Sequence, residues 1–196
     1  MDNLKKKYHL TKEYIDFFKK RTNKHIQSVQ TECKKILDGY MSSLFSEDQK
    51  IILLNNISQH DNSKFSDINE YHGYVLLTYY KKNNMEIPNE LNSLIQKVTY
   101  YHVKNNKHHP EYWDNDITIN CINLKDRDKP SNQITDATKM DKISITEMCC
   151  DWTAASNEFN KNVIEWADSN INKRWLFNEN QIVYIYMILK FLKSKK

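Results

Sequence analysis

Apolar residues recur at steps of three and four near the start of the chain, which is the period of an amphipathic helix. Thr11 is a suitable N-terminal cap, and Gly39 is a suitable stop after a helix that runs to about Leu37. The residues on its apolar stripe are Phe18, Thr22, His25, Val29, Cys33 and Ile36. Because such steps place side chains on one face of a helix, His25 is predicted to point into the core.

A second helix is predicted after Ser46, which together with Gln49 has the spacing of a capping box. Leu53 and Ile57 then continue the helical step as far as the doublet His60-Asp61. The pattern therefore predicts that this helix presents the doublet on its apolar side.

Two more helices are predicted in the middle of the chain. The first is capped by Ser66, reaches about Tyr80 and leaves His72 off its apolar stripe. The second has Pro88 in its first turn, and its stripe contains Leu91, Leu94, Ile95, Val98, Tyr101 and His102. His102 is therefore also predicted to face inward.

The histidine pair His108-His109 precedes Pro110, which disfavours helical geometry at the residue before it, so the pair is expected in a loop. A polar segment follows, at about 114–142. Its weak alternation of apolar residues could form a short hairpin that contains Ile117, Ile119, Cys121 and Leu124. A connection this long is more typical of a functional flap than of a linker.

The C-terminal part predicts three helices. Ser144 and Glu147 have the spacing of a second capping box, which would open a helix with Met148, Asp151, Trp152, Ala155 and Phe159 on one face. Glu147 stands one turn before Asp151 on the same face and could also orient a metal ligand, although capping already explains it. Helices at about 157–171 and 178–193 follow. A carboxylate inside an apolar stripe is costly unless it is paired, hydrogen-bonded or bound to a metal, so Asp151 is a candidate ligand.

Composition supports the all-α interpretation. Only two glycines and three prolines occur in 196 residues, which is too few turn residues for a many-stranded sheet protein. We expect residues 1–196 to form a single domain, which is long enough to bury its own core.

Cysteine usage and hydropathy bear on the cellular compartment. The four cysteines lack the spacing of a zinc site and are expected to be reduced thiols. The charged start predicts no secretory signal, and the longest apolar run, 182–189, is too short to span a membrane. The sequence therefore predicts a cytoplasmic protein without a membrane partner.

The formal charge of +4 comes from scattered lysines, which are typical of solvated faces. No basic helix with interleaved aromatic residues is present, so a nucleic-acid partner is not expected. A small anionic molecule would suit this charge balance.

Candidate chemistry comes from the inward-facing polar residues. Taken singly, His25, His60, His102 and Asp151 are more often structural than functional. Taken together, imidazoles and carboxylates on the inner faces of several helices are typical of a metal site in a helical bundle. We therefore predict a site for a divalent metal.

The order of these residues resembles that of the HD-domain metal-dependent phosphohydrolases. The matching residues are His25, the doublet His60-Asp61, and Asp151. Within that superfamily, Lys64 and the pair His108-His109 are similar to the branch that contains cyclic-dinucleotide phosphodiesterases. The Gly-Tyr-Pro tripeptide of that branch is absent, and Lys64 replaces the glutamate of the HD nucleotidases.

A closer resemblance is to an uncharacterised HD-like family of bacteriophages and large DNA viruses, domain of unknown function 5662. The segments that carry it are 60–66, 102–113 and 147–152. The resemblance spans about His25 to Ser156, which is most of the chain.

The resemblance implies an HD-type helical bundle with one or two divalent ions, which could be Mn, Fe, Zn, Ni, Co or Mg. One ion would be bound by His25, His60, Asp61 and Asp151. The other would be bound by His108 and His109 with His102, and Asp61 would bridge the two ions.

The implied activity is hydrolysis of a nucleotide or related phosphate ester. Asp61 and Lys64 are the expected catalytic residues, and Lys64 would also contact the substrate. Lys104, Lys107 and Trp113 are further substrate-binding candidates. The structural alternatives are a solvated lysine at 64 and a tryptophan that packs the flap against the core.

Two other functions fit the same residues. Some HD-type folds hold two irons and activate dioxygen, and imidazole and carboxylate ligands suit iron as well. A viral protein, located in the host cytoplasm, could instead use the fold only to bind a nucleotide or a host factor.

Overall fold

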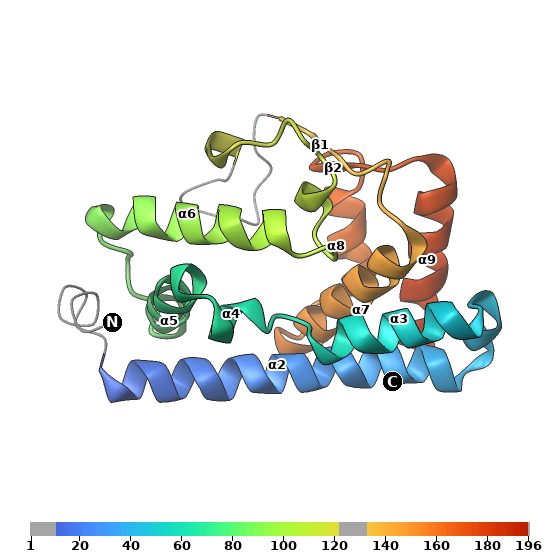
Figure 1. Cartoon of the computed structure of the whole chain (residues 1–196), viewed down its shortest axis with the longest axis horizontal. Helices are drawn as coiled ribbons and strands as arrows, with labels where there is room; N and C mark the ends of the chain where they lie inside the picture. The colour runs from blue at the N-terminus through green and yellow to red at the C-terminus, as the bar shows by residue number, and fades with distance from the viewer. Residues whose placement is uncertain (1–10, 122–132, 196) are drawn as a thin grey trace.

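In the computed structural model, the first helix among the described residues extends along one side of the molecule (Figure 1). The structure describes residues 11–121 and 133–195. Helix α2 spans Lys12–Asp38 and is capped by the Thr11 hydroxyl, as predicted. It ends at Gly39, where a Cβ atom would lie only 2.7 Å from Cζ of Phe191. A larger residue at the end of α2 would collide with the Phe191 ring, so the close packing of this ring against the chain requires glycine at position 39.

A 3₁₀ turn, η1 (Tyr40–Leu44), leads into helix α3 (Glu47–Ser58), which packs against α2. The predicted capping box of Ser46 and Gln49 is present and begins α3. The helix ends at Ser58, two residues before the doublet, so a turn rather than the helix presents His60-Asp61.

Helices α4 (Ser63–Ser66), α5 (Ile68–Lys82) and α6 (Asn89–Asn105) follow. The predicted cap at Ser66 was wrong, because Ser66 is the last residue of α4 and its hydroxyl donates to the Asn62 carbonyl. His72 is buried although the pattern leaves it off the apolar stripe. The reason is that α5 is covered by α2 on one side and by α6 on another.

The segment after α6 contains two short 3₁₀ helices, η2 (Pro110–Tyr112) and η3 (Ile119–Cys121). The suggested hairpin is wrong at Ile119 and Cys121, which form η3, while Leu124 lies outside the described residues. The described strands are β1 (Thr135–Asp136) and β2 (Trp175–Leu176), which pair in parallel. The Asp114 carboxylate accepts from the backbone N–H of Asp136, so the two ends of the predicted flap are joined.

Helices α7 (Lys142–Glu158), α8 (Val163–Asn170) and α9 (Glu179–Ser194) complete the chain. Asp141 rather than Ser144 caps α7, and its carboxylate accepts from the Ser144 N–H. Helix α8 begins later than the predicted 157, because Asn160 has a positive φ that interrupts the helical path before the Asn162 cap. The predicted helix after Asn178 is confirmed.

The fold is all-α, as predicted, and its apolar side chains form two cores. The larger core joins the C-terminal half of α2 to α3, α7, α8 and α9; it includes Val29, Ile36, Leu53, Met148, Ile185 and Leu189. The smaller core joins Phe18 of α2 to α5 and α6; it includes Val75, Leu76, Leu91, Ile95 and Val98. His25 lies on α2 between Phe18 and Val29, at the junction of the two cores.

Two sequence-based expectations, on the cysteines and on membrane-spanning helices, can be compared with the structure. All four cysteines are free thiols, in agreement with the prediction. Among residues 11–121 and 133–195, no helix is long and apolar enough to cross a membrane.

Candidate metal centre

The first histidine and the last aspartate of the predicted ligand set meet across the junction of the two cores. His25 Nε2 on α2 lies 2.9 Å from Oδ1 of Asp151 on α7. His60 Nε2 lies 3.9 Å from the same oxygen. The side chains of His25 and Asp151 are 15% and 20% exposed, so this edge of the centre is accessible to solvent.

The doublet is buried in the turn between α3 and α4. Asp61 has φ 58°, which is the left-handed region. This conformation costs a residue with a Cβ atom on the order of 1 kcal/mol and clusters at functional sites. The turn directs the Asp61 carboxylate toward histidines on other elements.

The two oxygens of Asp61 face different groups. Oδ1 lies 3.2 Å from His102 Nε2 and 3.9 Å from His108 Nε2. Oδ2 lies 4.0 Å from His60 Nε2 and 2.5 Å from Nζ of Lys64. The carboxylate thus stands between two sets of imidazoles.

Three of these imidazoles come from the end of α6 and the turn after it. The ring centroids of His108 and His109 are 4.2 Å apart, and those of His102 and His109 are 4.8 Å apart. His108 also lies 4.3 Å from the His60 ring. The structure therefore brings together every residue that the sequence predicts as a metal ligand: His25, His60, Asp61, His102, His108, His109 and Asp151. These residues are referred to below as the metal centre.

Two buried glutamates bind the outer nitrogens of the histidines. Glu147 Oε1 lies 2.9 Å from His60 Nδ1 and 3.1 Å from His108 Nδ1. Its predicted capping role was therefore wrong, and Asp141 performs that role instead. Glu70 Oε2 lies 2.8 Å from His102 Nδ1 and also accepts from Ser63. The sequence analysis did not identify Glu70 as a functional residue. Glu70 lies one turn before Tyr74 on α5, and both side chains are buried in the structure.

The electrostatic balance keeps the carboxylates of the centre ionised. Burial acts to raise the pKa of Asp61, but the Lys64 ammonium and His60 outweigh it and hold that pKa well below its usual range. Burial is likewise outweighed at Glu147, where hydrogen bonds from His108 and His60 lower the pKa to about 2. The pKa of Asp151 is lowered for the same reason by His25. Ionised carboxylates beside imidazole nitrogens suit a cation.

The donor atoms fit a metal. His60 Nε2, His102 Nε2 and Asp61 Oδ1 are buried in the described part of the chain without a hydrogen bond, whereas buried polar atoms normally have one. Three groups have ligand atoms that all lie within 4.8 Å of one another: His25, His60 and Asp151; His60, Asp61 and His108; and His102, His108 and His109. These groups could hold a metal ion.

The other predicted site residues have varied surroundings. Lys64 lies at the centre, with Nζ 4.9 Å from the Tyr74 ring centroid. Lys104 donates to the carbonyls of Glu111 and Asp114 at 3.0 and 2.6 Å, so its ammonium braces the segment after α6. The Trp113 indole donates to the Lys107 carbonyl and packs against the larger core, and the Lys107 side chain is exposed.

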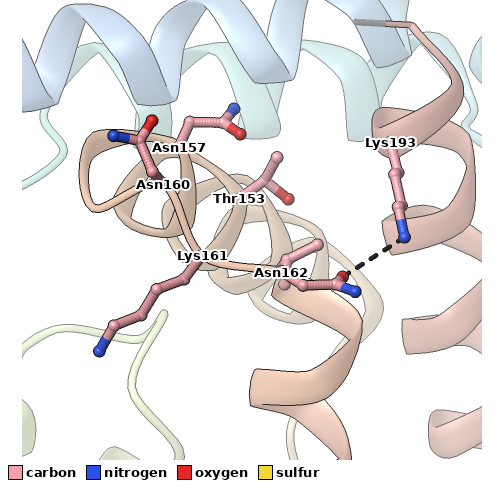
Figure 2. A pocket seen from close by; sticks show the side chains of 7 residues that line it. Thr153, Asn157, Asn160, Lys161, Asn162 and Lys193 are labelled. Carbon is pink, nitrogen blue, oxygen red and sulfur yellow. Dashed lines mark hydrogen bonds between the residues drawn. The ribbon is translucent and has the colours of Figure 1, made fainter.

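A separate surface hollow lies near the end of α7 and is lined by Thr153, Asn157, Asn160, Lys161, Asn162, Val163 and Lys193 (Figure 2). Thr153 is two residues after Asp151, which is a rotation of about 200° around the helix. The hollow therefore opens on the face of α7 opposite to the metal centre.

Comparison with known proteins identifies a family. The sequence profile described as a family of unknown function (DUF5662) matches residues 14–191. No curated protein and no solved structure matches the chain. The matched region covers nearly the whole chain and includes every residue of the metal centre, so the protein belongs to the family of unknown function DUF5662.

Proposed function

We propose that this protein is an HD-type, metal-dependent phosphohydrolase that acts on a nucleotide or a related phosphate ester. The observation that carries the proposal is the position of the Asp61 carboxylate, whose two oxygens face different histidine sets. A carboxylate in that position can bridge two cations. The proposal also rests on the order His25, His60-Asp61, His108-His109, Asp151 along the chain.

One ion would be held by His25, His60, Asp61 and Asp151, and a second by His102, His108 and His109 with Asp61 shared. Two bound divalent ions would lower the pKa of a water molecule and offset the charge of a phosphate group. His102, His108 and His60 have almost no exposed side-chain surface, so they can hold ions away from bulk water.

The open edge of the centre indicates where a substrate would enter. His25 and Asp151 are partly exposed, and so is Lys64, at 15% of its side chain. The Lys64 ammonium forms an ion pair with Asp61 Oδ2. Because an ammonium is a compact donor on a flexible stem, Lys64 can turn from Asp61 toward a phosphate oxygen that arrives at this edge. Its role would be to orient the ester and to neutralise part of its charge.

The first test is hydrolysis by the intact protein. The protein is stripped with a chelator, reloaded with Mn²⁺ and incubated with a panel of nucleotides and with bis-p-nitrophenyl phosphate. We expect metal-dependent release of phosphate or of a monophosphate, and a fall to background in Asp61→Ala. Glu179→Ala, which removes a carboxylate from the start of the distant helix α9, is the matched control and should retain the activity.

Other outcomes would contradict the proposal. Tight metal binding without cleavage of any ester in the panel would overturn it. Oxygen consumption by iron-loaded protein, again without ester cleavage, would favour the di-iron oxygenase chemistry that the same ligands allow. Circular dichroism of Asp61→Ala is needed to show that the variant is folded.

A further inference from the structure

Glu147 lies outside the ligand set, and one of its oxygens contacts the outer Nδ1 atoms of two histidines. Glu147 lies on α7, one turn before Asp151. Its Oε1 is 2.9 Å from His60 Nδ1 and 3.1 Å from His108 Nδ1. The two histidines come from different segments, the turn after α3 and the turn after α6.

These contacts set the tautomer of both imidazoles when the rings are neutral. An ionised carboxylate can only accept hydrogen bonds, so both Nδ1 atoms carry the proton. In a neutral imidazole the lone pair is then on Nε2. The Nε2 atoms of His60 and His108 lie 4.0 and 3.9 Å from the Asp61 carboxylate, on the inner side of the centre. One glutamate therefore directs one lone pair into each half of the ligand set.

Glu70 provides a contrast within the same centre. Its Oε2 lies 2.8 Å from His102 Nδ1 and 3.0 Å from the Ser63 hydroxyl. Glu70 thus forms a hydrogen bond with one histidine of the metal centre, and its other hydrogen bond is with a serine. Removing Glu70 should therefore affect the set that contains His102 and spare His25, His60 and Asp151.

We propose that Glu147 is a positioning residue that couples the two ion sites, so that both fill together and both are lost together. His60 belongs to the group with His25 and Asp151, and His108 to the group with His102 and His109, while a third group, His60, Asp61 and His108, contains both histidines and lies between the other two. The inference rests on the metal centre of the proposed function and does not depend on the reaction. Partners of this kind typically contribute about 10–100-fold to metal affinity.

The experiment measures metal binding by the full chain. Wild type, Glu147→Ala and Glu70→Ala are stripped, titrated with Mn²⁺ by calorimetry and followed by electron paramagnetic resonance, which separates a coupled ion pair from an isolated ion. We expect wild type to show a coupled pair. Glu147→Ala should lose about 10–100-fold in affinity at both sites, with no stage at which one site is filled alone. Glu70→Ala should weaken one site and show an isolated ion.

Each contrary result has a distinct meaning. If Glu147→Ala keeps one site at wild-type affinity, or if Glu70→Ala weakens both sites equally, the coupling role is overturned while the metal centre stands. If wild type binds no ion, both the proposed function and this inference fail. Glu147→Gln keeps a neutral acceptor and the side-chain shape. If the alanine variant does not fold, the glutamine variant should show a smaller, equal loss at both sites, and an unequal loss would contradict the coupling.

Discussion

The two cores of the molecule differ in the number of helices that enclose them. The larger core is enclosed by α3, α7, α8 and α9 around the C-terminal half of α2, and α7 is buried along most of its length. The smaller core contains α5, α6 and Phe18 of α2. The metal centre lies where the two meet, and its ligands come from both sides: Asp151 from the larger, His102 from the smaller.

The comparison shows that polar side chains replace apolar packing at the junction. Helix α2 crosses it as continuous backbone, while His102 of α6 contacts Asp61, and His108 in the segment after α6 contacts Glu147 of α7. A cation bound between them would add a link between the halves that apolar contacts do not supply. The smaller core should therefore depend on the metal more than the larger core does.

The largest expected effect is that of metal removal. A ligand at 100 times its dissociation constant stabilises the folded state by about 2.7 kcal/mol. Chelation of the loaded protein should remove about that much for each ion, measured as a lower thermal midpoint. Amide hydrogen exchange should increase more in α5 and α6 than in α7 and α9. Equal increases in both regions would contradict the expectation that the smaller core depends on the metal more than the larger core does.

A smaller effect is expected from Gly73→Ala on α5. A Cβ atom at Gly73 would lie 2.9 Å from Cβ of Val98 on α6 and would overlap with its methyl groups. Overpacking of this kind typically costs about 1–3 kcal/mol, against a gain of up to about 1 kcal/mol for alanine over glycine in a helix. Urea unfolding should show a net loss of stability.

The control for that prediction is the double variant with Val98→Ala. Removing the Val98 methyl groups opens space for the new Cβ atom, so the double variant should be less destabilised than the sum of the single changes. Strict additivity would show that the α5–α6 contact is looser than the structure indicates.

The smallest expected effect is that of Asp141→Ala at the start of α7. The substitution removes the acceptor for the Ser144 N–H, and loss of such a cap costs about 1 kcal/mol. Because Asp141 lies at the start of α7, before the first turn and away from Asp151, the loss should be the same with and without metal. Thermal melts of both forms check this. Ser144→Ala, which leaves the backbone donor in place, should have less effect on the cap.

The helices and the ligands were predictable where local signals determine them. Capping at Thr11 and Ser46 uses side chains and backbone within four residues, and the structure confirms both. The inward faces of His25 and His102 followed from the helical period, because each lies on a single apolar stripe.

A common physical cause explains the errors at Glu147, His72 and Glu70, because the role of each depends on residues that pack from elsewhere in the chain. Ser144 and Glu147 have capping-box spacing, but Asp141 is an equally good cap three residues earlier, and His60 and His108 bind Glu147. His72 is buried because α5 is covered on two sides, which a one-stripe pattern cannot show. Nothing local in the sequence could pair Glu70 with His102.

The left-handed backbone of Asp61 has a consequence for sequence design on this scaffold. A sequence chosen only to stabilise this backbone would place glycine at position 61, which would remove the steric cost of positive φ and the need to bury a carboxylate. Design methods that rank residues by folding free energy alone would therefore erase the residue on which the centre depends. Position 61 is where selection for stability and selection for chemistry conflict in this chain.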